Sequence, residues 1–360
     1  MALMLWPVPA AEAAGVPGVS ARSYVLMDAG TGTVLSERAA DEQMLVASTT
    51  KILTAVVALE HTVPDDVVEI KPEHVGIEGS SMYLRVGEMV TVRDLLYGLM
   101  LSSGNDAAVA LAYHVAGGVA EFALLMNEKA GALGMMNSHF LNPHGLDAEG
   151  HYSTARDMAV LTAYAMGIEH FVEIVSTRNA QAAERNFVNH NKLLWRYLGA
   201  EGVKTGFTKA AGRSLVSAAS RDGTRLICVT LSAPDDWADH AALLDWGFDH
   251  FKYYEILSQG YMVATVPVIS GLGDSVTLVA EEGLKLLASV GDEVVVVTEA
   301  PRFVYADIQA GKQGGRVFVT VNGEQMLETR LLFNESVALD ETNRLTFWEE
   351  MKARFGVAMS

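Results

Sequence analysis

The sequence predicts an α/β (α+β) domain, built on an antiparallel sheet with a helical insertion, followed by a small all-β domain. Strand-like runs open and close residues 18–257, and apolar helical patterns fill the interval between them. Short strand-like runs replace these helical patterns after about Leu257, which indicates the second domain. Half of the 360 residues are apolar, so the chain can bury a large core in each domain.

The elements of the first domain follow in a definite order. Strands are expected at both of its ends, at residues 22–28, 33–36, 212–220 and 224–232. The last two flank Asp222-Gly223, which is typical of a tight hairpin turn. Helices are expected elsewhere, at residues 49–60, 92–100, 107–115, most of 121–165, and 239–248. The loop Asn142-Pro143-His144-Gly145 interrupts the long helical stretch and is interpreted as a structural loop under the candidate functional site.

The second domain is expected at residues 258–340. Its strand-like runs cover residues 261–268, 275–280, 295–297 and 316–321. Asn322-Gly323 separates the last of these from another such run, and this pair of residues favours a type I′ hairpin.

Both chain ends have their own character. Residues 1–17 begin apolar and then become small, and Ala11-Glu12-Ala13 fits a cleavage site, so we interpret them as a signal peptide without its basic start. A flexible apolar tail is the alternative. Residues 341–360 predict an amphipathic helix, whose apolar face comprises Leu345, Phe347, Trp348, Met351, Phe355 and Met359. We expect this helix to lie in a membrane interface or, alternatively, to dock on the β domain.

Charge and cysteine content restrict the possible partners. The formal net charge is -18 and the isoelectric point is near 4.9, without a basic stripe, so nucleic acid is not expected as a partner. An anionic substrate would require a local cationic pocket. Cys228 lies in an alternating apolar run and predicts a buried strand residue.

Ser48-Thr49-Thr50-Lys51 is the only S-x-x-K in the chain. It precedes an apolar helix, so the serine hydroxyl and the lysine amine should lie one turn apart on the same face. Serine needs a base to become a nucleophile, and lysine serves as one only when burial or a nearby cation lowers its pKa. Composition alone predicts on the order of one such motif in a chain of this length, so the motif is weak by itself.

Two further motifs occur once each. Ser103-Gly104-Asn105 falls at a break between two helices, where a hydroxyl and a carboxamide suit proton relay and substrate binding. Taken alone, it is more typical of a helix cap and turn. Lys204-Thr205-Gly206 opens the second strand region, and its lysine would anchor a carboxylate and lower the pKa of Lys51. The conjunction of three single-copy motifs in this order is much more specific than any one of them.

Other patterns carry less weight. His139, His144 and His151 lack the spacing of a helical metal-ligand pair, and a serine mechanism needs neither a metal nor a cofactor. Gly30 and Gly32 belong to a turn, because no third glycine completes a dinucleotide motif.

At these motifs the sequence resembles the serine D-alanyl-D-alanine carboxypeptidases, which are low-molecular-weight penicillin-binding proteins. Their S-G-N variant stands here in place of S-D-N. The resemblance extends from about Ser20 to Phe251 and includes the stretches around residues 47–51, 101–108, 142–146, 152–155 and 202–208. It implies a β-lactamase/transpeptidase-like fold, and removal of the terminal D-alanine from peptidoglycan stem peptides that end in D-Ala-D-Ala. It also implies inhibition by β-lactam antibiotics, export to the cell envelope and a role in cell-wall synthesis.

The resemblance also implies individual roles. Ser48 would attack the carbonyl carbon, Lys51 would act as general base, and Ser103 would relay a proton to the leaving D-alanine. Asn105 would hold the acyl amide and Lys204 would orient the substrate. Thr205 and Thr208 would reach the terminal carboxylate, while the backbone N–H groups of Ser48 and Phe207, beside Gly206, would form the oxyanion hole.

One position departs from the family. Many relatives carry an arginine that helps to bind the terminal carboxylate where this chain has Asp236. Carboxylate recognition is therefore expected to depend on Lys204 and the threonines, or on a residue that the sequence does not identify.

Three other functions compete with this interpretation. A class A β-lactamase would need a deacylating glutamate, but no Glu-x-x-x-Asn occurs between Ser103 and Lys204. A non-catalytic penicillin-binding sensor or scaffold would tolerate loss of Ser48, Lys51 or Lys204, and all three are present. Transpeptidase or endopeptidase activity uses the same nucleophile and stays open.

Overall fold

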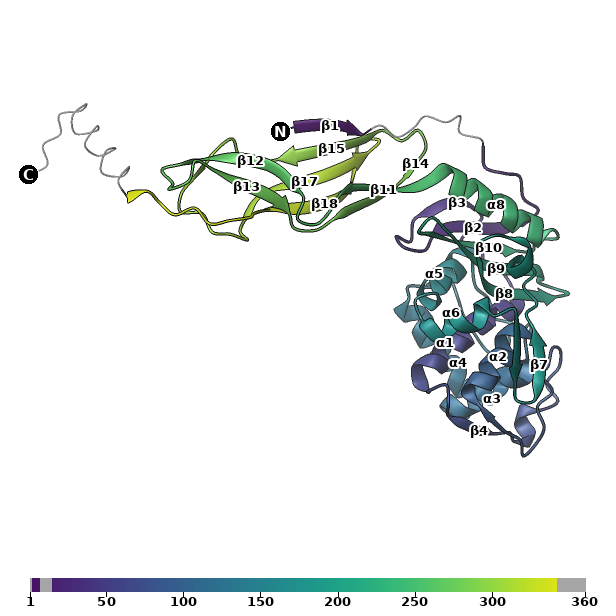
Figure 1. The fold of residues 1–360 in the computed structure, drawn as a ribbon. Coiled ribbons are helices and arrows are strands. Elements are labelled where there is room, and N and C mark those ends of the chain that lie inside the picture. Colours follow the sequence, from purple (N-terminus) through teal and green to yellow (C-terminus); the bar gives the residue numbers. More distant parts are fainter. Residues whose placement is uncertain (1, 7–14, 342–360) are drawn as a thin grey trace, which may run out of the picture. The chain divides into compact units, whose positions relative to one another are not determined.

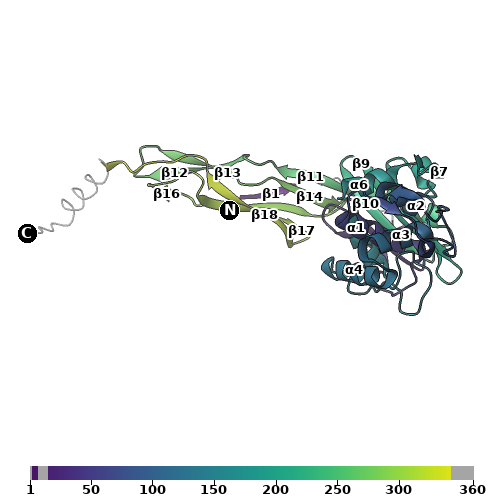
Figure 2. The same cartoon turned by 90° about the horizontal axis from the view of Figure 1, so that it is seen from below.

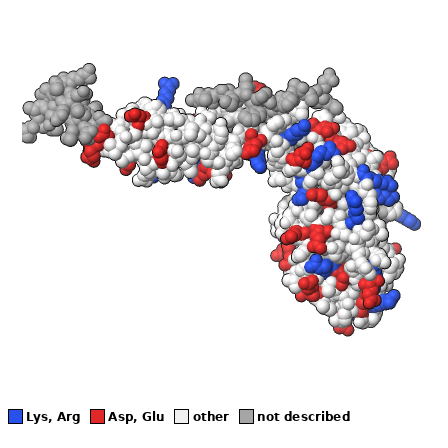
Figure 3. All heavy atoms as spheres, viewed as in Figure 1, with Lys and Arg blue, Asp and Glu red and all other residues white. Residues whose placement is uncertain are grey.

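The computed structural model describes residues 2–6 and 15–341, which form two compact units. Residues 15–249 make the first, and the described residues from His250 onward, together with the strand β1 (Ala2–Trp6), make the second. The predicted fold class, an antiparallel sheet with helices followed by a separate all-β unit, is confirmed. Acidic and basic side chains are interspersed on the face of the first unit that Figure 3 shows.

The first unit is built on a five-stranded antiparallel sheet in the order β3-β2-β10-β9-β8. Its strands are β2 (Ser23–Asp28), β3 (Val34–Arg38), β8 (Ala200–Thr208), β9 (Gly212–Arg221) and β10 (Thr224–Leu231). Asp222 and Gly223 both have positive φ values (50° and 79°), as a type I′ turn requires, so the predicted hairpin between β9 and β10 is confirmed.

Helices cover both faces of this sheet (Figure 1). One face carries the helical insertion, α1 (Lys51–His61), α2 (Val92–Leu101), α3 (Asn105–Ala116), α4 (Val119–Ala132), α5 (Ala155–Ala165) and α6 (Glu169–Ser176). The other face carries α8 (Asp236–His250). Alternation along the strands explains both layers: Val25 and Met27 face the helical insertion, whereas Leu26 packs with α8.

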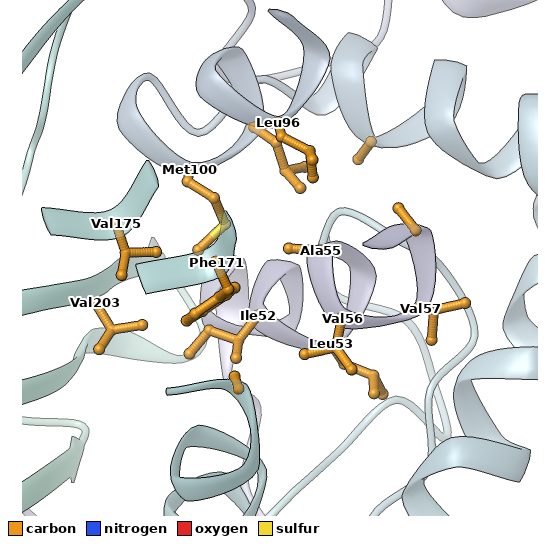
Figure 4. Close-up of a cluster of buried hydrophobic side chains, with 14 of the residues drawn as sticks. Ile52, Leu53, Ala55, Val56, Val57, Leu96, Met100, Phe171, Val175 and Val203 are labelled. Carbon is orange, nitrogen blue, oxygen red and sulfur yellow. The ribbon is translucent and has the colours of Figure 1, made fainter. Parts of the chain in front are cut away.

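Helix α1 lies at the centre of the larger core. Figure 4 shows Ile52 and Val56 of α1 gathered with Leu96 of α2 and Phe171 of α6. Its first eight residues are all buried, including Lys51 at its N-terminus. Helix α1 is therefore held in position by packing along its buried length.

Short elements and loops differ from the sequence-based expectation. Helical structure stops at Ala132 and resumes at Ala155, a longer gap than predicted. Gly134 has a φ of +77° and ends α4, because the left-handed backbone that it adopts cannot continue the helix. The sequence analysis also missed α7 (Leu193–Arg196) and two small hairpins, β4 (Val67–Glu69) with β5 (Met89–Thr91) and β6 (Asn179–Ala182) with β7 (Arg185–Val188).

The second unit consists of β strands among its described residues (Figure 2). One sheet has the order β1-β15-β17-β18-β13-β12-β16, and β11 (Phe251–Leu257) pairs separately with β14 (Leu284–Ser289). The remaining strands are β12 (Met262–Ile269), β13 (Ser275–Ala280), β15 (Val294–Glu299), β16 (Val304–Tyr305), β17 (Gln313–Val321) and β18 (Glu324–Phe333). The Asn322-Gly323 turn between β17 and β18 is confirmed by φ values of 51° and 88°.

The two ends of the chain bear differently on the sequence-based expectations. Ala2–Trp6, part of the predicted signal peptide or tail, pairs antiparallel with β15 as strand β1. The predicted cleavage site at Ala11-Glu12-Ala13 and the predicted helix at the C-terminus lie outside the described residues.

A buried histidine joins α8 to the sheet. His240 is fully buried, and its Nδ1 lies 2.6 Å from the Ser217 hydroxyl of β9 while its Nε2 lies 2.9 Å from the Thr230 hydroxyl of β10. Burial lowers the pKa of His240 to about 3, because a charged imidazolium would lose its hydration there.

This histidine makes the first unit acid-sensitive. Between pH 6.5 and about 3 the unfolded chain binds a proton that the folded chain excludes. The free energy of unfolding should therefore fall as the pH is lowered, by up to about 1.4 kcal/mol per pH unit from this residue. Denaturant titrations followed by tryptophan fluorescence should show a steeper pH dependence for the wild type than for His240→Gln. The exposed His114, changed to Gln, is the control that keeps the wild-type slope; equal slopes for all three proteins would contradict the argument.

Candidate active site

Ser48 and Lys51 meet at the N-terminal end of α1. Ser48 belongs to the 3-10 turn η1 (Ala47–Thr50), which leads directly into the helix. The Lys51 Nζ lies 2.9 Å from the Ser48 Oγ, in agreement with the predicted spacing of one helical turn. Ser48 is half-buried and opens onto a cleft, whereas Lys51 is fully buried beneath it.

The Lys51 amine has two further partners, and both contact it through carbonyl oxygens. Its Nζ donates to the Asn105 Oδ1 at 2.7 Å and to the His144 backbone oxygen at 2.6 Å. Carbonyl oxygens only accept hydrogen bonds, so these contacts use both N–H bonds of a neutral amine. The remaining lone pair then faces the Ser48 hydroxyl. This geometry allows Lys51 to accept the serine proton.

Electrostatics favour the neutral amine. Burial, and then the charge of Lys204, hold the pKa of Lys51 well below its ordinary value of 10.5. Burial also lowers the pKa of Lys204 to about 7. The Lys204 Nζ donates to the Thr205 backbone oxygen at 2.9 Å and acts on the cleft from beneath it. The predicted field of Lys204 on Lys51 is therefore present.

The Ser103-Gly104-Asn105 segment lies between α2 and α3 and forms a second side of the site around Ser48 and Lys51. Ser103 has a φ of 60°, a strained backbone conformation for serine, and its side chain lines the cleft. The Asn105 carboxamide is engaged within the protein, since its Oδ1 accepts from Lys51 and its Nδ2 donates to the Glu78 backbone oxygen at 2.5 Å.

Asp106 fixes the segment to a neighbouring loop. It is buried, and its carboxylate accepts from the Ser81 hydroxyl at 2.6 Å and from the backbone N–H groups of Met82 and Leu84 at 2.9 and 3.1 Å. The sequence analysis did not single out Asp106. Its position directly after Ser-Gly-Asn was the available signal.

Strand β8 forms a third side of the site, as the edge strand of the five-stranded sheet. A Cβ atom on Gly206 would lie 3.2 Å from the Ser48 nitrogen and 3.0 Å from the Val46 oxygen, so the strand passes against η1. Thr205, Gly206 and Phe207 line the cleft. The Thr208 hydroxyl instead donates to Asp147 at 2.9 Å, outside the cleft lining.

The cleft lies entirely within the first unit and has a volume of about 800 Å³. It is lined by Ser48, Ser80, Ser103, Val188, Asn189, His190, Lys192, Trp195, Arg196, Thr205, Gly206, Phe207, Arg213, Asp236 and Trp237. Three exposed cations, Lys192, Arg196 and Arg213, therefore line a cleft in a chain of net charge -18. This is the local positive pocket that an anionic substrate requires.

The loop at residues 142–146 supports the site from below, as the sequence predicts. Besides the His144 oxygen, the Pro143 oxygen accepts from the Thr54 hydroxyl of α1 at 2.6 Å. His151 Nε2 lies 2.9 Å from the Thr50 Oγ1, and its Nδ1 accepts from the Leu141 N–H at 3.2 Å. Burial lowers the pKa of His144 and of His151 to about 4, so both are neutral near pH 7. Their role here is structural.

Comparison with known proteins gives a consistent result. The family model described as D-alanyl-D-alanine carboxypeptidase matches residues 10–235, and the one described as penicillin-binding protein 5, C-terminal domain, matches residues 251–339. The D-alanyl-D-alanine carboxypeptidase DacF of Bacillus subtilis is 31% identical over 88% of this chain and 86% of its own. DacC of Escherichia coli is 34% identical over 89% and 85%.

Solved structures agree with these sequence matches. Penicillin-binding protein 5 of Haemophilus influenzae superposes with a TM-score of 0.74 at 31% identity, over 90% of this chain and 99% of that one. Penicillin-binding protein 6B of Escherichia coli gives a TM-score of 0.72 at 30% identity, over 89% and 98%.

Gly145 should be essential for the approach of this loop to η1. It has a φ of +82°, and a Cβ atom there would lie 1.9 Å from the Ala47 oxygen and 2.9 Å from the Thr50 Oγ1. We expect Gly145→Ala to lower the free energy of unfolding by about 3 kcal/mol or more, through overpacking added to backbone strain. Denaturant unfolding measures the loss.

Gly150 provides the matched control in the same loop region. It has a φ of +87°, but a Cβ atom there would meet only the Leu141 Cδ1, at 3.6 Å. Gly150→Ala should therefore cost only the backbone strain, about 1–2 kcal/mol. Equal losses for the two variants would show that the contact with Ala47 does not matter.

Proposed function

The chain belongs to the D-alanyl-D-alanine carboxypeptidase family and is a serine-type carboxypeptidase, and on that premise we propose that Ser48, Lys51 and Ser103 carry its reaction. The substrates are peptidoglycan stem peptides that end in D-Ala-D-Ala, and β-lactams acylate the same serine. One observation carries the assignment: the buried Lys51 amine, already hydrogen-bonded to two carbonyl oxygens, has only the Ser48 hydroxyl left as a partner.

Acylation follows from that arrangement. Lys51 takes the Ser48 proton as the Oγ forms a bond to the carbonyl carbon of the penultimate D-alanine. The negative charge that develops on the carbonyl oxygen is stabilised by the backbone N–H groups of Ser48 and Phe207, an effect worth about 3–4 kcal/mol per donor in comparable enzymes. The approach of Gly206 to the Ser48 backbone supports this pairing, because it brings β8 and η1 together.

Release of the leaving group requires the proton to move on. The C–N bond breaks as Lys51 returns the proton to the leaving amine through Ser103, whose side chain lines the cleft with Ser48. Water then attacks the acyl-enzyme, Lys51 again accepts a proton, and the Ser48 Oγ leaves with it. The products are the shortened stem and free D-alanine.

Substrate binding uses the residues around this centre. Thr205, Gly206 and Phe207 line the cleft on β8, and Lys204 supplies positive charge from below. Asn105 binds the acyl amide of the substrate once its carboxamide turns away from Lys51 and the Glu78 oxygen. Thr208 reaches the terminal carboxylate of the substrate once its hydroxyl leaves Asp147.

Where the enzyme works follows from its substrate. Peptidoglycan lies outside the cytoplasm, so we place the protein there, exported with the help of the segment that ends near Ala13. Among the described residues, no single helix is both long and apolar enough to span a bilayer. We further propose that the residues after Thr342 bind the membrane interface, on the strength of their amphipathic sequence pattern alone.

The general-base assignment predicts the result of a conservative substitution. Lys51→Arg keeps the positive charge but cannot give up a proton near neutral pH, so release of D-alanine from a pentapeptide should fall about a hundredfold or more. Mass spectrometry of the products measures both the release and the peptide that remains.

Two companion variants make that result interpretable. Ser48→Ala should lose the activity and its labelling by a fluorescent penicillin. Lys129→Arg, at a lysine that contacts Glu60 and lies outside the cleft lining, should match the wild type. Near-normal turnover by Lys51→Arg would refute the general-base role. Cross-linked products in place of the shortened stem would refute the hydrolytic assignment.

The membrane proposal has a separate test. Full-length protein should float with vesicles that contain anionic lipid, and a version that ends at Thr342 should stay in the dense fraction. Binding should survive moderate salt, because Glu349 and Glu350 weaken attraction to the lipid and apolar burial dominates. Equal behaviour of the two proteins would exclude this anchor.

A further inference from the structure

Arg213 occupies a distinctive place in the cleft. It lies near the start of β9, directly opposite Phe207 of the edge strand β8, and both residues line the cleft. Residues opposite each other in an antiparallel pair share a face of the sheet, and Thr205, two residues before Phe207, shares that face too. Thr205 and Arg213 are therefore diagonal neighbours, close enough for a long side chain to reach.

The guanidinium is held in place from one side only. Its Nη2 donates to the Asp236 Oδ1 at 2.9 Å, and its Cζ lies 5.9 Å from the centre of the Trp237 ring. Asp236 and Trp237 begin α8 and also line the cleft. Within residues 2–6 and 15–341, the Arg213 side chain has no other hydrogen-bond partner, and it is 43% exposed. Most of its five N–H donors are thus free for a ligand.

Two other exposed cations, Lys192 and Arg196, line the cleft, but they flank or belong to α7 and do not lie on β8 or β9. The buried Lys204 cannot take the place of Arg213 either. Lys204 is buried, its amine already donates to the Thr205 oxygen, and it is not among the residues that line the cleft. A carboxylate that binds beside Thr205 would meet no exposed positive charge on this face of β8 and β9 except Arg213. A guanidinium also matches a carboxylate better than an ammonium, because it offers two parallel donors.

We propose that Arg213, oriented by Asp236, binds the terminal carboxylate of the substrate beside Thr205. The inference rests on the proposed function and adds the residue that selects peptides with a free C-terminus. Asp236 then has a role of its own: it positions the Arg213 guanidinium, which comes from β9. The Arg213–Asp236 pair is part of the specificity site, although neither residue takes part in proton transfer.

The test compares one peptide in two forms. An acylated peptide that ends in D-Ala-D-Ala is assayed with its free carboxylate and as its C-terminal amide. Arg213→Gln should lose about tenfold to a hundredfold in kcat/KM for the acid, mostly through a higher KM, because the contact exists before and during the reaction. The amide should change less than about threefold. Arg213→Lys should retain part of the activity on the acid, because it keeps the positive charge but loses the two parallel N–H donors of the guanidinium.

A second arginine–aspartate pair on the same two elements supplies the control. Arg221, at the far end of β9, contacts Asp245 of α8 at 3.3 Å, and neither residue lines the cleft. Arg221→Gln should therefore keep the wild-type kinetics on both peptides. Thermal unfolding of both glutamine variants checks that the fold is intact. If the amide turns over too slowly, its inhibition constant against the acid replaces its kcat/KM.

Each outcome has one meaning. Loss on the acid alone, confined to the Arg213 variants, supports the assignment. Unchanged kinetics of Arg213→Gln on the acid, or an equal loss on acid and amide, overturns it while leaving the proposed function intact. A wild-type enzyme that releases neither D-alanine from the acid nor D-alaninamide from the amide would overturn the proposed function and this inference with it.

Discussion

The catalytic unit depends on how one buried amine is hydrogen-bonded. Lys51 has lost its hydration, and two carbonyl oxygens, from Asn105 and from His144, take the place of water. An ammonium in that position would be costly, whereas a neutral amine has both N–H bonds satisfied and a lone pair directed at Ser48. The same contacts that make the burial tolerable thus give the lysine the protonation state that a general base needs.

Much of the surrounding structure serves to bring those two oxygens to the amine. The loop at residues 142–146 must lie against α1, which leaves room only for glycine at Gly145. The turn between α2 and α3 must bring the Asn105 carboxamide to Lys51. Asp106 holds this turn in place, because its carboxylate accepts hydrogen bonds from the Ser81–Leu84 loop. Strand β8 must pass close to η1, so that Lys204 lies near enough to lower the pKa of Lys51. The dense packing around α1 resists the strain and desolvation that accumulate at the site.

The exposed charges in the cleft are opposite in sign to the net charge of the chain. The protein is strongly acidic, yet the exposed charges in the lining of its cleft are positive, and the acidic residue among them, Asp236, is buried against Arg213. Burial raises the pKa of Asp236 from its ordinary value, while Arg213 opposes that shift, so the two groups stabilise each other's charge. A negative surface elsewhere does not prevent recognition of an anionic peptide, because exposed charges more than about 10 Å away are largely screened by salt.

The sequence by itself determined what local geometry controls. The type I′ turns at Asp222-Gly223 and Asn322-Gly323 need only two residues with positive φ, and the Ser48–Lys51 contact needs only one helical turn, so short-range patterns sufficed for these. The two-part fold class also followed, because helical and strand periodicity change where the composition changes. The end of α4 and the strand β1 were missed, since a glycine cap and the pairing of a remote segment decided them.

Only the tertiary structure decided which distant residues complete the site. Asn105 and His144 lie 54 and 93 positions from Lys51, and nothing in the spacing of the motifs specifies that their oxygens reach its amine. Arg213 carries no motif at all, and the register of β8 against β9, together with the packing of α8, brings it to the cleft. The physical reason is that helix and turn geometry act over a few residues, whereas strand register and loop packing depend on the whole core.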